Sequence, residues 1–186
     1  MTEDKKIHFL RVERKFRATI LSWFEAEHVR EFYYGTGLQN TLANLEFYFK
    51  GIRHNGRYSF DHWIALLGDT PFGFLMTSPI EGPYDTDDDY NKWFVRGKRT
   101  LTLDLLIGPK EFLGQGLAHR MIQEFILDQF ADADFFMIDP GQSNQKAIHV
   151  YEKAGFKKVG EFCPSYDPVP HFMMRLAVQD LKDNVK

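Results

Sequence analysis

The feature that most constrains this chain is an apolar stretch that runs into a glycine-rich turn, from Leu101 to Ala118. Its first part, LTLDLLI over 101–107, is typical of a buried strand. Gly114-Gln115-Gly116 then precedes an amphipathic segment that predicts a helix over 114–130. Glycines at a helix entrance allow close approach of a ligand, and the free N–H groups of a first helical turn bind anions. An ordinary strand–turn–helix connection is the alternative interpretation.

One residue of this strand is polar where its neighbours are apolar. By the twofold alternation of a strand, one face carries Leu101, Leu103, Leu105 and Ile107, and the other carries Thr102, Asp104 and Leu106. Burying a carboxylate without a partner is costly. Asp104 is therefore either a structural residue that caps nearby amides or a catalytic base whose pKa is raised by apolar surroundings.

A second segment, SNQKAIHVYEKAGF over 143–156, predicts a helix from Ser143 to Lys153. Asn144, Ala147 and Tyr151 are three and four residues apart, so they share one helical face. That face either lines a groove or packs Tyr151 against the sheet. The helix taken alone leaves both interpretations open.

The remaining pattern predicts one continuous domain over 1–186. Strands are predicted at 7–11, 57–67, 71–77, 98–107, 135–138, 156–162 and 172–177. Further helices are predicted at 15–32, with a break near Glu25, and at 41–52, with Thr41 as the N-cap. Glycines 35 and 37 are expected to separate these two helices. The order predicts an α/β (α+β) fold, a mixed sheet with helices on its faces.

Composition narrows the function classes. The net charge of −3 and the lack of a clustered basic face argue against a nucleic-acid surface. No apolar run has the length of a membrane span or of a signal peptide. The single cysteine, Cys163, fits a reducing compartment, so a soluble cytoplasmic protein is expected. The histidines lack zinc-ligand spacing, and no metal is predicted.

The most acidic segment, Glu81 to Asp89, lies in a long loop over 79–97. Loops of that length inside a compact domain are often functional. Asp87 and Asp88 could raise the local concentration of a cationic substrate. A solvated surface loop is the other interpretation.

Together these segments resemble the GNAT superfamily of acyl-CoA-dependent N-acyltransferases. The signature Arg/Gln-x-x-Gly-x-Gly/Ala corresponds to residues 113–118, with Leu113 in place of Arg or Gln. The spacing of Asn144, Ala147, Tyr151 and Gly155-Phe156 also matches. Residues 28–32, 41–43, 113–117 and 139–156 further resemble the bacterial aminoglycoside 6'-N-acetyltransferases.

The resemblance implies a GNAT fold, with a central, mostly antiparallel sheet of about seven strands flanked by about four helices. It implies acetyl-CoA as the cosubstrate, held by Leu106, Ile107, Gly114, Gln115, Gly116, Leu117, Ala118 and Asn144. Asp104 falls where the family has its catalytic acidic residue, Tyr151 at the proposed general acid, and Asp139 on a substrate contact. The expected acceptor contacts are Phe32, Tyr33, Asp87, Asp88 and Asp139.

The expected reaction is acetyl transfer to a primary amine of a small cationic acceptor, with the 6'-amine of an aminoglycoside as the first choice. A siderophore precursor, another metabolite amine or a protein N-terminus is the alternative acceptor. A non-catalytic acyl-CoA sensor is the alternative of another class, and it would tolerate the loss of Asp104. The sequence leaves the acyl-chain preference open, as well as the choice between monomer and homodimer.

Overall fold

The computed structural model describes residues 6–85 and 88–184 of the chain. These residues form a seven-stranded sheet in the order β1-β2-β3-β4-β5-β7-β6. The strands are β1 (Ile7–Arg11), β2 (Asp61–Leu67), β3 (Thr70–Pro79), β4 (Thr100–Ile107), β5 (Phe135–Ile138), β6 (Lys157–Phe162) and β7 (His171–Ala177). The number of strands and their order along the chain agree with the prediction.

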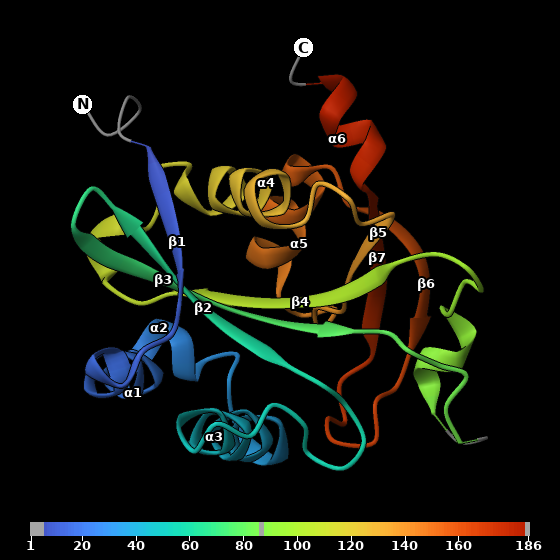
Figure 1. Cartoon of the computed structure of the whole chain (residues 1–186), viewed down its shortest axis with the longest axis horizontal. Coiled ribbons are helices and arrows are strands. Elements are labelled where there is room, and N and C mark those ends of the chain that lie inside the picture. Colours follow the sequence, from blue (N-terminus) through green and yellow to red (C-terminus); the bar gives the residue numbers. More distant parts are fainter. Residues whose placement is uncertain (1–5, 86–87, 185–186) are drawn as a thin grey trace.

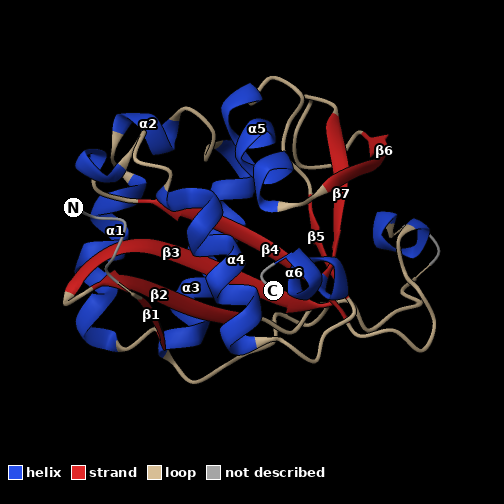
Figure 2. Cartoon of the chain, turned by 90° about the horizontal axis from the view of Figure 1, so that it is seen from above, coloured by secondary structure: helices blue, strands red, loops and turns tan. Residues whose placement is uncertain are grey.

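Helices cover both faces of the sheet (Figure 1). The α-helices are α1 (Arg17–Phe24), α2 (Glu27–Arg30), α3 (Gly35–Phe49), α4 (Leu117–Gln129), α5 (Gln145–Ala154) and α6 (Val178–Asn184). Short 3-10 helices are η1 (Arg14–Phe16), η2 (Asp89–Lys92) and η3 (Lys110–Phe112). Figure 2 shows α4 lying across β3 and β4, with α5 beside it. No helix of the described part is long and apolar enough to cross a membrane.

The faces of β4 point into two separate cores. Leu101, Leu103 and Ile107 pack in the core that includes residues of α4, α5 and α6. Leu106 packs in the other core, with residues of α1, α2 and α3. The predicted alternation of this strand is therefore confirmed, and Asp104 belongs to the face that turns toward α1 to α3.

The sheet opens between β4 and β5. These two strands are parallel, and their ladder pairs Thr100–Thr102 with Phe135–Met137. The ladder of β4 with β3 is antiparallel and continues to Ile107. The second half of β4 therefore keeps β3 on one edge and turns its other edge toward an opening beside α5.

Several predicted boundaries were wrong. Helix α3 begins at Gly35, and Thr41 lies inside it, where its hydroxyl donates to the carbonyl of Gly37 over 3.0 Å. Thr41 is thus a residue that bonds back to its own helix rather than an N-cap. Strand β2 begins at Asp61, because the Asn55 side chain accepts from the backbone N–H groups of residues 57 and 58 and makes a turn there.

The expected number of helices was too low. The helix predicted over 15–32 is interrupted near Glu25 as expected, and its second piece forms the four-residue α2. Helix α6 was not predicted, because it follows β7 directly and its apolar residues continue the strand pattern. Val178 and Leu181 nevertheless anchor α6, since both are buried in the core that also contains α4.

Candidate active site

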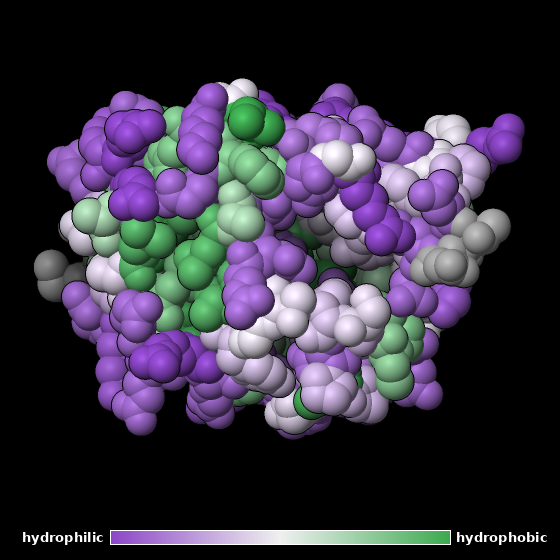
Figure 3. Space-filling view, turned by 90° about the horizontal axis from the view of Figure 1, so that it is seen from below, coloured by the Kyte–Doolittle hydropathy of each residue, from purple (hydrophilic) through white to green (hydrophobic). Residues whose placement is uncertain are grey.

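A cavity of about 510 Å³ lies at the opening between β4 and β5. Its walls come from the segment between α2 and α3, the second half of β4, α5 and the loop between β6 and β7. Figure 3 shows a hollow near the middle of the face that carries α3. A cavity of this size holds a small molecule and suits a binding site.

Asp104 lies on β4 at the floor of this cavity. The residue is exposed, and its side chain borders the open cavity. Burial raises the pKa of Asp104 to about 7, and the nearby charge of Asp139 acts in the same direction, while His171 opposes both. A carboxyl group that titrates near neutral pH is suited to accept a proton during a reaction.

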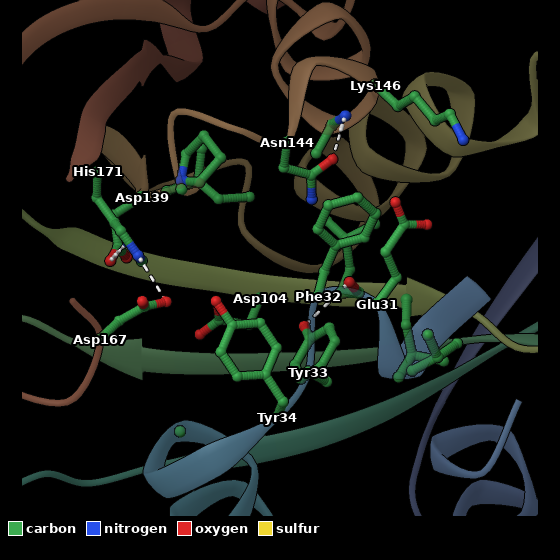
Figure 4. A pocket seen from close by; sticks show the side chains of 18 of the residues that line it. Glu31, Phe32, Tyr33, Tyr34, Asp104, Asp139, Asn144, Lys146, Asp167 and His171 are labelled. Atoms are coloured by element: carbon green, nitrogen blue, oxygen red, sulfur yellow. Dashed lines mark hydrogen bonds and ion pairs between the residues drawn. The ribbon is translucent and has the colours of Figure 1, made fainter. Parts of the chain in front are cut away.

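A network of acidic groups stands beside Asp104 (Figure 4). Asp139 follows β5, and its Oδ2 lies 3.2 Å from Nδ1 of His171, the first residue of β7. The other ring nitrogen of His171, Nε2, lies 3.3 Å from Oδ2 of Asp167. The hydroxyl of Tyr166 donates to Asp139 Oδ2 over 3.0 Å. We call Asp104, Asp139, Tyr166, Asp167 and His171 the acidic end of the cavity.

Of this network, only Asp104 and Asp139 were predicted as site residues. Asp167 and His171 are four residues apart, but Asp167 lies in the loop between β6 and β7 and His171 begins β7. Outside a helix, a spacing of four residues does not indicate that two side chains are neighbours. The bridge between Gly141 and His171 brings them beside Asp139. The sheet register is thus what assembles the acidic end.

Tyr151 projects from α5 into the same cavity. Burial raises its pKa far above the usual value, and the charges of Asp104 and Asp139 raise it further. Tyr151 therefore remains protonated and can act as a hydrogen donor. Ala147 also lines the cavity, so the helical face predicted from the sequence does turn toward a hollow.

The aromatic pair lies on the opposite wall. Phe32 and Tyr33 both line the cavity. The hydroxyl of Tyr33 donates to the carbonyl of Leu105 over 3.1 Å, so it holds the free edge of β4. Burial raises the pKa of Tyr33 well above its usual value, and Asp104 adds to the shift.

At the other end of the cavity, α4 begins without a capping side chain. Gly116 is its N-cap, with a left-handed φ of 73°, and Gly114 has the same φ. Neighbouring Leu113 and Ala118 line the cavity. The first N–H groups of α4 are therefore available to an anion, and the helix dipole favours one there. We call residues 113–118 together with the free edge of β4 the donor end.

The free edge of β4 exposes alternate peptide groups. The carbonyls of Leu105 and Ile107 accept from Tyr33 and from the ring of His28, at 3.1 and 3.0 Å. The N–H groups of these two residues point the same way, because both groups of a residue in an antiparallel ladder share one edge. Leu106 was predicted with Ile107 to offer its backbone to a ligand. By the same alternation its peptide groups turn toward β3, and Leu105 takes its place.

The oxygen and the nitrogen of the Asn144 side-chain amide have different surroundings. It is the N-cap of α5, where its Oδ1 accepts from the N–H of Ala147 over 3.1 Å. The helix was predicted to begin at Ser143, and it begins at Gln145 instead. Figure 4 shows the amide nitrogen of Asn144 on the cavity side, where it can donate to a ligand.

The acidic loop does not reach this cavity through Asp88. The Asp88 carboxylate is buried outside the cavity lining, where Oδ2 accepts from the Tyr58 hydroxyl at 2.6 Å and from Arg57 Nε at 3.0 Å. A carboxylate with these partners holds its own loop, so Asp88 is corrected from a substrate contact to a structural residue. Asp87, the other predicted contact, lies outside the described residues.

Within the described part of the chain, no three His, Cys, Asp or Glu side chains are arranged to hold a metal ion. Asp139 and Asp167 each hydrogen-bond to a different ring nitrogen of His171.

Comparison with known proteins yields one family and a consistent set of relatives. Residues 17–163 match the family described as an acetyltransferase (GNAT) domain. The crystal structure of an aminoglycoside N(6')acetyltransferase from Legionella pneumophila superposes with a TM-score of 0.84 at 36% sequence identity, covering 97% of both chains.

Two further relatives are more distant. The aminoglycoside N(6')-acetyltransferase type 1 of Klebsiella pneumoniae is 29% identical over 150 residues, which are 77% of this chain and 70% of that protein. The structure of AAC(6')-Ib in complex with ribostamycin and coenzyme A has a TM-score of 0.76 at 22% identity, covering 97% of this chain and 98% of that chain. At 22% identity, the similarity to AAC(6')-Ib shows a shared fold alone.

Proposed function

Since the chain belongs to the GNAT family of acetyltransferases, we propose that it uses acetyl-CoA to acetylate a primary amine of a small polycationic acceptor. The proposed acceptor group is the 6'-amine of an aminoglycoside. One observation carries the proposal: a single cavity joins an uncapped helix N-terminus at one end to Asp104, Asp139 and Asp167 at the other. The Legionella pneumophila and Klebsiella pneumoniae relatives, at 36% and 29% identity, are both aminoglycoside 6'-N-acetyltransferases by name, and this supports the choice of acceptor.

The donor end fits the phosphates and the amide-rich arm of coenzyme A. The first N–H groups of α4, from Leu117 onward, would bind the pyrophosphate, with Gly114 and Gly116 allowing its close approach. The amide nitrogen of Asn144 and the N–H groups of Leu105 and Ile107 would hold the arm beside β4. When bound, acetyl-CoA supplies an acyl group that is activated as a thioester.

The acidic end fits the acceptor. A polycationic amine would be bound as its ammonium form, and the reacting nitrogen must lose a proton before it can attack. Asp104, whose pKa of about 7 favours proton uptake at neutral pH, would take this proton directly or through a water molecule. Asp139 would bind another ammonium or hydroxyl group of the acceptor.

Tyr151 would complete the proton balance. As the C–N bond forms and the C–S bond breaks, its hydroxyl would donate a proton to the leaving sulfur. The reference pKa of a thiol is about 8.5 and that of tyrosine about 10, and burial raises the pKa of Tyr151 still further. Full proton transfer from Tyr151 to the thiolate is therefore unfavourable, so Tyr151 has an assisting role as a hydrogen-bond donor to the leaving sulfur.

Release of the CoA thiol from acetyl-CoA tests the proposal across a panel of amines. The panel contains kanamycin, tobramycin, spermidine, hydroxylysine and N-terminal peptides. Saturable release that is selective for the aminoglycosides is expected, with acetylation at the 6'-amine shown by mass spectrometry of the product. Release with another amine alone would replace the acceptor and keep the chemistry. Bound coenzyme A with no release on any amine would overturn the proposal.

A further inference from the structure

His171 occupies an unusual position between two carboxylates of the acidic end. Its Nδ1 faces Asp139 at 3.2 Å and its Nε2 faces Asp167 at 3.3 Å. The three side chains are 8%, 12% and 17% exposed, so water screens them weakly. Asp139 comes from the segment after β5, and Asp167 from the loop between β6 and β7.

The protonation state of the ring follows from this geometry. A neutral imidazole carries one N–H and one lone pair, so it can donate to a single carboxylate and turns its lone pair toward the other. Only the imidazolium form donates to both. Burial lowers the pKa of His171, but the hydrogen bonds and charges of Asp139 and Asp167 outweigh burial and raise it above its usual value.

We propose that the His171 imidazolium is a positioning residue that ties Asp139 and Asp167 into one rigid carboxylate pair for the acceptor. The identity of the acceptor rests on the proposed function; the tie between the three side chains does not. His171 acts through the two aspartates and has no role in the proton transfers of the reaction.

The surrounding hydrogen bonds leave one oxygen for the acceptor. Oδ2 of Asp139 already accepts from Tyr166 and His171. Oδ1 of Asp167 accepts from the backbone N–H of Val169 at 2.9 Å. Oδ1 of Asp139 has no hydrogen bond from another described residue, so the network directs this oxygen to a ligand. Among the described residues, the charged or titratable groups that interact with His171 include Asp104, Asp139, Asp167 and Tyr166.

Positioning and simple charge predict opposite effects of replacing His171. As a positive charge in a site for a cation, His171 would repel the acceptor, so its removal would lower the KM of the acceptor. As the tie between two carboxylates, it pre-orders the site, so its removal would raise that KM. The sign of the change therefore separates the two roles.

The first experiment observes the tie without turnover. The imidazole nitrogens of ¹⁵N-histidine-labelled protein are titrated by NMR, with His171→Gln identifying the signal. The pKa of His171 is expected to lie above the ordinary histidine value of about 6.5, with both nitrogens protonated below it, and Asp139→Asn and Asp167→Asn should each lower this pKa. A His171 pKa at or below the ordinary value would overturn the proposal.

The second experiment measures kinetics with acetyl-CoA and whichever amine of the panel turns over. His171→Gln keeps one amide donor and is expected to raise the acceptor KM about tenfold. Loss of the His171 charge should raise the pKa of Asp104, so kcat is compared at a pH above that pKa, where it should change less than about threefold, since Asp104 and Tyr151 remain. Above the pKa of His171, the neutral ring of the parent enzyme has also lost one donor. In that pH range the acceptor KM of the variant should approach that of the parent. An acceptor KM that falls would overturn the proposal.

Tyr166→Phe is the matched control, because it removes a neutral donor from the same oxygen of Asp139. It should raise the acceptor KM less than His171→Gln, by a factor that stays constant across the same pH range. An equal, pH-independent effect of both variants would reduce His171 to an ordinary structural residue. If no amine turns over, the proposed function fails, while the NMR titration still decides the protonation of His171.

Discussion

The two ends of the cavity are built from different parts of the chain. At the acidic end the functional groups are side chains: Asp104, Asp139 and Asp167 are held by His171 and Tyr166. At the donor end they are backbone N–H groups, exposed because α4 has no side-chain cap and β4 has a free edge. The first end thus depends on residue identity and protonation, and the second on backbone conformation.

This difference makes the ends respond to different changes. The acidic end should be sensitive to pH and to conservative substitution, since each carboxylate owes its properties to its neighbours. The donor end should tolerate most side-chain changes and fail where a left-handed glycine is replaced. The following predictions test this contrast, from the largest expected effect to the smallest.

Asp104→Asn should produce the largest effect. Removal of the proposed base is expected to lower kcat by about a thousandfold, with the acetyl-CoA dissociation constant unchanged in calorimetry. In the parent enzyme, kcat/KM should rise with pH through about 7, as Asp104 becomes the base form. That rise should be absent from the variant, and a variant with undiminished turnover would refute the assignment.

The same substitution has a consequence for stability. The pKa of Asp104 is higher in the folded chain than in the unfolded chain, where the value is 3.8. Between these two pKa values the folded state binds more protons, so its stability falls as the pH rises toward 7. Asp104→Asn should therefore raise the thermal unfolding midpoint at about pH 8 and leave it unchanged below about pH 4. A lower midpoint at pH 8 would contradict the raised pKa of this carboxyl group.

Gly116→Val should impair the donor end alone. Valine is strained at a φ of 73° and places its side chain at the start of α4. The acetyl-CoA KM is expected to rise by about tenfold or more, with the acceptor KM little changed. Gly97→Val is the control, because Gly97 has a φ of 74° and lies in the loop before β4 rather than at the start of α4. Equal losses in both variants would point to backbone strain rather than the anion site.

Tyr151→Phe should have a smaller effect. The raised pKa of Tyr151 makes it a weak proton donor, so kcat is expected to fall by about tenfold or less. Both KM values should change little, as measured by steady-state kinetics. A loss as large as that of Asp104→Asn would make proton donation to sulfur an essential step.

Leu113→Arg should have the smallest effect. It places a cation where the resemblance expects Arg or Gln, on an exposed residue of the donor end. An exposed ion pair is worth about 1 kcal/mol or less, so the acetyl-CoA KM should fall less than about fivefold, and less again at high salt. A larger gain would show that side chains as well as backbone form the phosphate site.

Several features were predictable because their signals are local in the chain. The alternation along β4 placed Asp104 on the correct face, and the three- and four-residue spacing brought Ala147 and Tyr151 to the cavity. A glycine turn at the start of a helix was also expected, and Gly114 and Gly116 both have a left-handed φ there. The start of α3 was misplaced, because Gly35 and Gly37 read as a break and instead form its first turn.

The sequence by itself determined the order of strands and helices along the chain, the glycine turn and the family resemblance, because periodicity and short motifs act between residues close in the chain. Only the tertiary structure decided which acids meet in the cavity. It buried Asp88 against Tyr58 and Arg57, and it brought Asp167 and His171 beside Asp139 through the register of β5, β6 and β7. A carboxylate takes its pKa and its partners from groups distant in sequence, so its role depends on the folded neighbourhood that no local pattern contains.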